Sequence, residues 1–413
     1  MKALIINTSD DYGGAAVASY RLFKGLRQIG VNSQMYVQNK TRSEFRIIAP
    51  ASKIDKFLSF VRPFVDTIPL TFYKNRQESP WSPAWAPHSL SNIIHQVNPD
   101  IIHLNWICQG FIPVPEIGKM NKPVVWTMHD MWPFTGGCHY SDQCCKYEQG
   151  CGACPQLGST RTRDLSSWVW GRKKRLWENL DLTIVSPSRW LAGCAQASSL
   201  FEKQKIVTIP NGLDLDRFKP VDKTISRNLL QLPPEKKLIL FGAVSATTDK
   251  RKGIQFLFDA LNDLAETGEF DHAEIVVFGS EKPEQEPATD YKINYLGNVP
   301  GDIALSLLYS AADVFIAPSL QEVFGLTVLE SIACGTPVVA FDVGGIPDII
   351  DHRKNGYLAQ PFDSHDLARG ISWVVSDETR WKSLSENCRS KAVANFDIAS
   401  IARQYAKLYQ EIL

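Results

Sequence analysis

Short apolar runs alternate with segments of helical periodicity along the whole chain. In the first half, unbroken apolar runs predict strands at 3–7, 34–37, 100–106, 123–129 and 182–186. Helical spacing between them predicts helices at Ala15–Ile29, His88–Val97 and Ser167–Asn179. The second half repeats the pattern, with expected strands at 237–243, 273–279, 293–297, 313–319 and 336–341. Because parallel strands covered on both faces are apolar throughout, the pattern predicts two Rossmann-like, doubly wound α/β domains.

The expected border between the two domains is the segment IPNGLDLDRFKPVDKT at 209–224, where proline, glycine and aspartate cluster after a short strand. The predicted domains are therefore residues 1–210 and 211–394. The tail, 395–413, carries apolar residues at helical spacing from Ile398 to Ile412 and is followed by no further strand. It is predicted to be an amphipathic helix.

Composition narrows the class of protein. The 413 residues are 44% hydrophobic and 21% charged, which is typical of a globular protein with more than one core. The chain has 44 basic and 44 acidic residues, and this zero net charge does not favour nucleic acid as a partner. The start, MKALIINTSDDYGG, breaks at polar residues and predicts a buried strand rather than a signal peptide. Since no run approaches the ~20 apolar residues of a membrane span, a cytoplasmic protein is expected.

Two glutamates in the second half, Glu322 and Glu330, lie eight residues apart. The apolar run before them predicts a strand that ends in a loop at Glu322, and helical spacing then places Glu330 about one and a half turns into a helix. Either glutamate alone is more often a partner of the helix dipole, which contributes ~0.3–1 kcal/mol.

The start of that helix offers backbone groups as well. The N–H groups of Phe324, Gly325 and Leu326 are expected at the helix N-terminus, where a phosphate group would be stabilised by the dipole and by hydrogen bonds. An anionic leaving group held beside two carboxylates indicates a nucleotide-sugar site.

Two loops in the first half carry further candidates. His129 and Asp130 end the run 123–129, at the carboxyl end of a strand, where α/β proteins bind ligands. A histidine there either orients a sugar hydroxyl, donates to an oxygen that gains charge, or merely caps the strand. Gly13 and Gly14 precede the first helix, where they allow backbone to approach a ligand or form a plain turn.

A basic pair, Arg251 and Lys252, follows the strand expected at 237–243. Two cations at that place neutralise a diphosphate without a metal ion, although a basic pair in a loop is commonly only solvated. Asp214 and Asp216 have Asp-x-Asp spacing, but they lie in the border segment rather than at the end of a strand. The sequence therefore predicts chemistry that requires no metal or other cofactor.

A cysteine-rich loop, TGGCHYSDQCCKYEQGCGACPQLG at 135–158, follows His129. The C-x2-C pair Cys151 and Cys154, with Cys138 and Cys144 upstream, predicts a structural zinc site of four thiolates. The alternatives are reduced thiols, or disulfides if the compartment is oxidising.

The segment 57–88 mixes aromatic residues with Arg62, Lys74 and Arg76. This composition is compatible with a membrane-surface or lipid-acceptor patch. A packed helix followed by an ordered, proline-rich loop explains it equally well.

The pattern S-x2-E-x2-G-x4-E-x4-G-T-P-V-V at 319–339 is long and constrained. Together with Gly13-Gly14, His129, N-G-L-D at 211–214 and R-K-G at 251–253, it resembles the retaining glycosyltransferases of family 4, the group 1 transferases with the GT-B fold. The cysteine-rich loop resembles a segment in the subset of that family linked to capsule, colanic-acid and O-antigen polysaccharide biosynthesis.

This resemblance implies two Rossmann-like domains with a cleft between them and a final helix that crosses back to the N-terminal domain. The donor, a UDP or GDP sugar, would bind the C-terminal domain, and a glycan or polyprenyl-diphosphate-linked acceptor would bind the N-terminal one. By resemblance, Glu330 would bind the ribose hydroxyls, Glu322 would face the reacting sugar, and His129 would touch it. The glycines at 13–14 would face the donor phosphates and the acceptor.

One position departs from the family pattern. Ala243 stands where the family has an arginine, so the resemblance implies that Lys252 and the amides of 324–326 hold the diphosphate with help from Arg251. An enzyme of this kind would work in the cytoplasm, with peripheral contact at the inner face of the plasma membrane. A nucleotide-sugar epimerase of the same fold and a non-catalytic nucleotide-sugar-binding subunit are the alternative functions.

Overall fold

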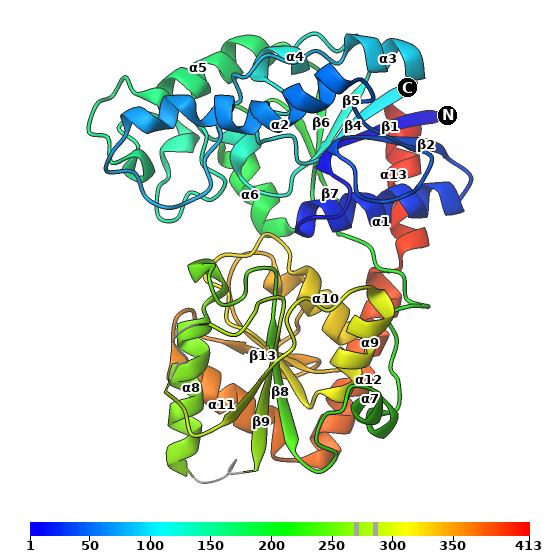
Figure 1. Ribbon diagram of the computed structural model, residues 1–413, viewed down its shortest axis with the longest axis vertical. Helices are drawn as coiled ribbons and strands as arrows, with labels where there is room; N and C mark the ends of the chain where they lie inside the picture. The colour runs from blue at the N-terminus through cyan, green and yellow to red at the C-terminus, as the bar shows by residue number, and fades with distance from the viewer. Residues whose placement is uncertain (268–271, 284–287) are drawn as a thin grey trace. The chain divides into compact units, whose positions relative to one another are not determined.

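A computed structural model describes residues 1–267, 272–283 and 288–413 (Figure 1). The chain divides into two compact units. The N-terminal unit comprises Met1–Pro210 together with Ile401–Leu413, and the C-terminal unit comprises Asn211–Ser400.

The N-terminal unit is built on a parallel sheet whose described strands have the order β3-β2-β1-β4-β5-β6-β7. Its strands are β1 (Lys2–Ser9), β2 (Asn32–Asn39), β3 (Ile47–Ile48), β4 (Ile101–Leu104), β5 (Val124–Thr127), β6 (Leu182–Ser186) and β7 (Lys205–Thr208). Its helices are α1 (Gly14–Gln28), α2 (Lys53–Thr67), α3 (Ser91–Val97), α4 (Val114–Ile117), α5 (Leu165–Trp177) and α6 (Arg189–Ala197). Short 3₁₀ turns follow at η1 (Ile68–Phe72), η2 (Trp132–Phe134), η3 (Lys146–Glu148) and η4 (Pro155–Leu157).

The last helix, α13 (Ile398–Ile412), completes the N-terminal unit. Its buried side chains Ile401, Tyr405 and Tyr409 share one apolar core with β1 residues such as Ile5. The helix thus packs its apolar stripe on the sheet that begins the chain.

The C-terminal unit contains a second parallel sheet, with the described strands in the order β10-β9-β8-β11-β12-β13. Its strands are β8 (Lys237–Gly242), β9 (Ala273–Phe278), β10 (Lys292–Tyr295), β11 (Val314–Ala317), β12 (Val338–Phe341) and β13 (Gly356–Ala359). Its helices are α7 (Lys223–Leu229), α8 (Ile254–Thr267), α9 (Asp302–Ala311), α10 (Leu326–Ala333), α11 (Ser364–Val375) and α12 (Glu378–Asn395), with 3₁₀ turns η5 (Lys250–Lys252) and η6 (Ile346–Asp348).

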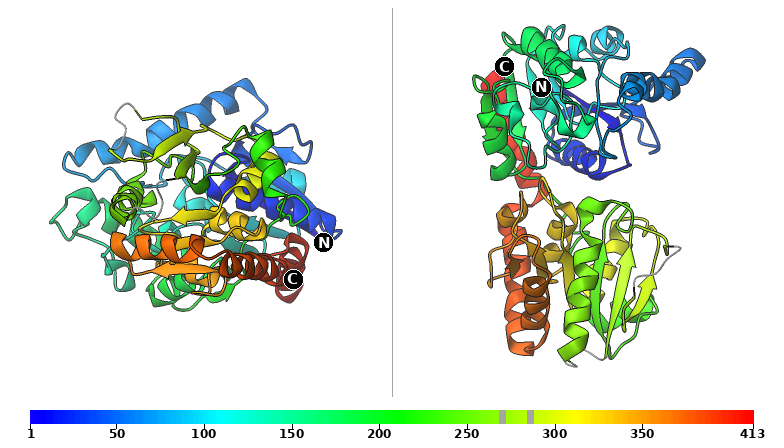
Figure 2. Two further views of the ribbon diagram at one scale, coloured as in Figure 1. Left: turned by 90° about the horizontal axis from the view of Figure 1, so that it is seen from below. Right: turned by 90° about the vertical axis from the view of Figure 1, so that its left-hand side faces the viewer.

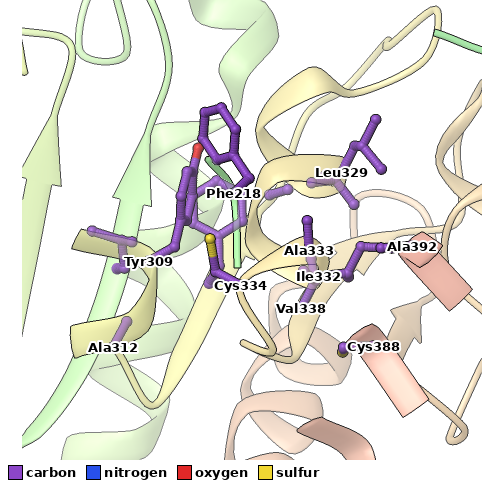
Figure 3. Close-up of a cluster of buried hydrophobic side chains, with 14 of the residues drawn as sticks. Phe218, Tyr309, Ala312, Leu329, Ile332, Ala333, Cys334, Val338, Cys388 and Ala392 are labelled. Atoms are coloured by element: carbon purple, nitrogen blue, oxygen red, sulfur yellow. The ribbon is translucent and has the colours of Figure 1, made fainter. Parts of the chain in front are cut away.

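The second sheet is covered on both faces. Helices α8 and α11 pack on one face, and α9, α10 and α12 pack on the other (Figure 1). Figure 3 shows the second of these cores, in which Phe218, Tyr309 and Leu329 lie among smaller side chains. This is the covered parallel sheet that the apolar runs predict.

Local differences from the expected elements have local causes. Helix α3 begins at Ser91 rather than His88, because His88 and Leu90 are bonded elsewhere: His88 Nδ1 lies 2.6 Å from the Phe111 carbonyl oxygen, and the Leu90 N–H donates to Glu116. Among the described residues, no helix is both long and apolar enough to cross a membrane.

Candidate active site

Two loops follow the carboxyl ends of neighbouring strands of the second sheet, and they are hydrogen-bonded to each other. One runs from β8 to α8, and the other runs from β11 to α10. The Leu320 N–H donates to the Arg251 carbonyl oxygen at 2.8 Å. Gly253 has φ +70°, and a Cβ there would lie 1.9 Å from the Pro318 carbonyl oxygen, so only glycine permits this approach. These two contacts at the junction of the loops fix the positions of Arg251 and Gly253, and therefore also that of Lys252 between them.

The junction brings Lys252 and Glu322 together. Lys252 Nζ lies 2.8 Å from Glu322 Oε2, and the two side chains are 24% and 18% exposed. The backbone of Glu322 is held from the other side, since its carbonyl oxygen accepts the Gly345 N–H at 2.9 Å. A Cβ on Gly344, where φ is +56°, would lie 2.0 Å from that same oxygen. The carboxylate is therefore presented from a fixed backbone and remains within reach of solvent.

Helix α10 starts directly after this carboxylate. Gly325 is its N-cap with φ +99°, and Leu326 is its first residue. Of the three amides expected at the helix start, that of Leu326 lies in the first turn, that of Gly325 belongs to the N-cap residue, and that of Phe324 precedes the cap. The turn is completed by the amides of Thr327 and Val328, which are the groups placed to meet an anion.

Glu330 lies farther along α10 and is almost fully buried, with 5% exposure. Its Oε2 accepts a hydrogen bond from the Tyr309 hydroxyl of α9 at 3.0 Å. Sequence reasoning did not find Tyr309, since nothing in the pattern of α9 distinguishes a tyrosine that supports a carboxylate from one that fills the core. Contact of Glu330 with a ribose remains a prediction.

Arg251 is engaged by a neighbour that the sequence analysis missed. Its Nη2 lies 2.6 Å from Asp249 Oδ2 and its Nε lies 3.1 Å from Asp249 Oδ1. The Asp249 carboxylate also caps η5 by accepting the Arg251 N–H at 3.0 Å. Arg251 is thus tied to its own loop by Asp249, and its contribution to a diphosphate site stays a prediction.

In the N-terminal unit, His129 follows β5 and Asn105 follows the adjacent strand β4. His129 Nε2 lies 3.0 Å from Asn105 Oδ1. Burial lowers the pKa of His129 to about 4, against a smaller opposing effect of Asp130, so the imidazole is neutral near pH 7. Asn105 Nδ2 is a buried donor that finds no protein acceptor among the described residues. Together the two side chains offer hydrogen-bonding groups at the carboxyl edge of the sheet.

Asp130 serves the protein rather than a ligand. Its carboxylate accepts the Trp106 indole N–H at 2.6 Å and the Trp132 backbone N–H at 2.8 Å, and it lies 2.5 Å from His139 Nδ1. Burial alone would raise the pKa of Asp130, but His139 and the N–H donors outweigh it and lower the pKa below its ordinary value. His139 belongs to the cysteine-rich loop, so this network ties that loop to the end of β5.

The glycine pair at 13–14 and the histidine of β4, His103, differ in kind. Gly13 is the N-cap of α1 with φ +88°, and Gly14 is the first residue of that helix. A Cβ on Gly13 would meet no described atom within 4 Å, so the glycine is required for its conformation and the space before it is open. His103 is fully buried, its two ring nitrogens lie 2.5 Å from the Tyr409 hydroxyl and 2.7 Å from Thr127 Oγ1, and burial lowers its pKa to about 3. It is a structural link to α13.

The four cysteines expected to bind zinc, Cys138, Cys144, Cys151 and Cys154, line one cavity of about 20 Å³ beside Trp81. No group of three or more His, Cys, Asp and Glu side chains has metal-binding geometry in 1–267, 272–283 or 288–413. The expected tetrathiolate arrangement is therefore not seen. Burial raises the pKa of Cys138, Cys154 and Cys151, the last to about 11, so these thiols are neutral, and Cys151 Sγ accepts the Gly136 N–H at 3.1 Å.

Two family profiles match the chain in succession. The profile described as Glycosyltransferase Family 4 matches residues 12–217, and the one described as Glycosyl transferases group 1 matches residues 222–392. The chain therefore belongs to the group 1, family 4 glycosyltransferases, whose GT-B architecture of two parallel-sheet α/β domains it shares.

Curated relatives agree with this membership. An uncharacterised glycosyltransferase of Methanocaldococcus jannaschii is 31% identical over 245 residues, which are 57% of this chain and 60% of that protein. A D-inositol 3-phosphate glycosyltransferase of Corynebacterium jeikeium is 29% identical over 260 residues, 58% of this chain and 59% of that protein. The aligned part of this chain thus spans about 60% of the length of each of these relatives.

Solved structures resemble the whole chain in fold. A sucrose-phosphate synthase from Thermosynechococcus elongatus has a TM-score of 0.69 at 20% identity, covering 100% of this chain and 98% of that one. HepE of Anabaena, crystallised with UDP-glucose, has a TM-score of 0.64 at 19% identity and full coverage of both chains.

Proposed function

We propose that this protein transfers a sugar from a nucleotide-diphosphate sugar to a glycan or polyprenyl-diphosphate-linked acceptor, with retention of anomeric configuration. The observation that carries the proposal is the Lys252–Glu322 pair beside the first turn of α10. A cation, a carboxylate and helix amides at the carboxyl edge of one parallel sheet are what a sugar diphosphate requires. The complex of HepE with UDP-glucose supports a nucleotide-diphosphate sugar as the donor. The nucleotide proposed here is UDP or GDP.

In the proposed reaction, the diphosphate binds Lys252 and the amides that begin at Leu326. Lys252 then exchanges part of its contact with Glu322 for phosphate oxygens, and the released carboxylate oxygen meets a hydroxyl of the transferred sugar. The bond between the anomeric carbon and the phosphate oxygen breaks as the bond to the acceptor oxygen forms on the same face. The acceptor proton passes to the departing phosphate, which gains the negative charge that Lys252 and the amides stabilise.

The remaining assignments follow the same proposal. Glu330 binds the ribose hydroxyls, Gly13 and Gly14 face the donor phosphates and the acceptor, and neutral His129 orients a sugar hydroxyl. Arg251 contributes only long-range positive charge, since Asp249 holds its guanidinium. No metal ion is required, because cations and amides take the place of one. We place the reaction in the cytoplasm, at the inner face of the plasma membrane, and within surface-polysaccharide assembly.

A screen of UDP-, GDP- and ADP-sugars for donor hydrolysis tests the function and identifies the donor. With that donor, Glu322→Gln is expected to lower kcat by about 100-fold or more while changing nucleotide affinity little, because the carboxylate acts on the sugar rather than the nucleotide. The exposed Glu386→Gln in the same unit is the matched control. Wild-type turnover in Glu322→Gln at saturating donor would reduce Glu322 to a structural partner of Lys252.

The product distinguishes the alternatives. Nuclear magnetic resonance of the glycoside should show the anomeric configuration of the donor. Isomerisation of the donor without an acceptor would instead identify an epimerase, and tight donor binding without turnover would identify a non-catalytic subunit.

A further inference from the structure

Helix α2 and the turn η1 lie on the outside of the N-terminal unit (Figure 2). Their polar side faces inward, the reverse of an ordinary surface helix. The buried positions recur every three to four residues and are mainly polar: Ser59, Arg62, Asp66 and Leu70. The exposed positions recur with the same spacing and are large and apolar: Ile54, Phe57, Leu58, Phe60, Phe64, Ile68 and Phe72. Since a globular helix normally buries its apolar stripe, this orientation calls for an explanation outside the unit.

The orientation is held by specific contacts. The Asp66 carboxylate accepts the Trp85 N–H at 2.9 Å and the Ala84 N–H at 3.3 Å, while the Asp66 carbonyl oxygen accepts the Trp85 indole N–H at 3.1 Å. Gly110 packs so closely on the helix that a Cβ there would lie 2.5 Å from the Arg62 carbonyl oxygen. Ser52 caps the first turn by accepting the Asp55 N–H at 3.0 Å. These contacts hold the polar face of the helix against the body of the unit, so the apolar face points outward.

The apolar face is concentrated and continuous. Seven of the eighteen exposed large apolar side chains among the described residues lie between positions 54 and 72, so this is a patch rather than ordinary scatter. Phe57, Phe60 and Phe64 are 65%, 69% and 64% exposed, and the rings of the last two lie 5.7 Å apart. An apolar surface of this size on one helix indicates a docking site.

The charges beside the patch indicate its partner. Lys53 and Lys56 are exposed in the first turn of α2, and Lys74 and Arg76 are exposed just after η1. The exposed acidic residues of the same stretch are Asp55 and Glu78. The four basic side chains beside the apolar patch therefore outnumber the two acidic ones. A symmetric contact between two copies would bring these like charges together, whereas anionic headgroups would complement them.

We propose that the α2–η1 surface, residues 53–76, docks this protein onto an anionic phospholipid bilayer. The helix lies in the plane of the interface, its phenylalanines enter the boundary between headgroups and acyl chains, and the flanking cations meet lipid phosphates. This partner suits the lipid-linked acceptor of the proposed function, but the surface itself is independent of the donor site, which lies in the C-terminal unit.

Flotation of the full chain with phosphatidylcholine vesicles, with and without one-third phosphatidylglycerol, tests the inference. The chain should float with anionic vesicles, less so as salt increases, because the lysines contribute through screened charge. Phe57→Ser/Phe60→Ser/Phe64→Ser should weaken partitioning by about 100-fold or more, since three aromatic rings no longer enter the bilayer. Lys53→Gln/Lys56→Gln/Lys74→Gln/Arg76→Gln should remove the preference for anionic lipid.

The matched control is Ile225→Ser/Leu229→Ser, which removes two exposed apolar side chains from α7 and should leave flotation unchanged. Failure of the wild-type chain to float, or equal flotation of the phenylalanine variant, would overturn the proposal. So would sedimentation velocity showing a dimer that the phenylalanine substitutions dissociate. The same variants should bind a nucleoside diphosphate with unchanged affinity. If neither the wild-type chain nor any variant binds one, the donor site is refuted, but the vesicle result still stands.

Discussion

Replacing Lys252 by methionine separates a ligand-binding role from a structural one. In the structure, Lys252 Nζ lies 2.8 Å from Glu322 Oε2, and both side chains are partly exposed. A partly exposed ion pair contributes roughly 0–1 kcal/mol to stability, so the variant should lose less than about 1 kcal/mol of unfolding free energy. A lysine bound to a diphosphate makes charge-assisted hydrogen bonds of ~1.5–3 kcal/mol each. The expected loss of affinity is therefore about 10- to 150-fold in Kd.

Titration calorimetry with UDP, GDP and ADP measures this loss on whichever diphosphate binds the wild-type protein most tightly. The corresponding nucleoside is the ligand control, because it lacks the phosphates that Lys252 is expected to meet. The variant also leaves the Glu322 carboxylate unpaired beside the diphosphate, so Lys252→Met/Glu322→Gln should recover part of the lost affinity. Such recovery would measure the coupling between the two side chains directly.

Arg251→Met is the protein control, since Asp249 already engages its guanidinium at 2.6 Å. Its effect on Kd should stay below about fivefold, the range of an exposed ion pair. Unchanged diphosphate affinity in Lys252→Met would refute the phosphate role of this lysine. A loss of unfolding free energy as large as the loss of binding free energy would show instead that Lys252 mainly holds the two loops together.

Glu330→Ala is expected to weaken nucleoside diphosphate affinity by about 10- to 150-fold, because it removes charge-assisted bonds to ribose, and unchanged calorimetric affinity would refute this role. Donor turnover should survive treatment with EDTA, whereas loss on chelation with recovery in Mg²⁺ or Mn²⁺ would require a metal mechanism. If Cys138, Cys144, Cys151 and Cys154 close around an ion, protein purified without chelators should carry about one zinc per chain; elemental analysis without zinc and nine freely titrating thiols would contradict this. Burial lowers the pKa of His129 to about 4 and that of His103 to about 3, from an ordinary 6.5. The unfolded chain then binds more protons between about pH 3 and 6.5, so unfolding free energy measured with denaturant should fall as pH decreases through that window. A flat profile would argue against these two lowered pKa values.

Much of the fold was predictable because its causes are local. Apolar runs of strand length alternate with segments of helical periodicity. This pattern predicts parallel strands covered on both faces, without any knowledge of which strands are neighbours. Strand β6 coincides with its predicted residues, 182–186, and α10 begins at Leu326, one of the residues expected at its N-terminus. The sequence also places Glu322 in a loop after a strand, since the strand, the loop and the helix each have their own signal.

The partners of the site residues were not predictable in this way. Lys252 and Glu322 are 70 residues apart and meet only because β8 and β11 are adjacent and Gly253 packs on Pro318. The contact between Glu330 and Tyr309 requires α9 to lie beside α10. Such contacts depend on strand order and on helix packing, which no pattern within one segment encodes.

Helix α2 shows the same division most clearly. The spacing of Phe57, Phe60 and Phe64 is enough to define an apolar stripe and an opposite polar one, whatever the helix packs against. Which stripe faces the protein is a matter of tertiary contacts. Here the Asp66 carboxylate accepts backbone N–H groups of the 84–86 segment, which would otherwise be buried without partners, and this bonding turns the phenylalanines outward.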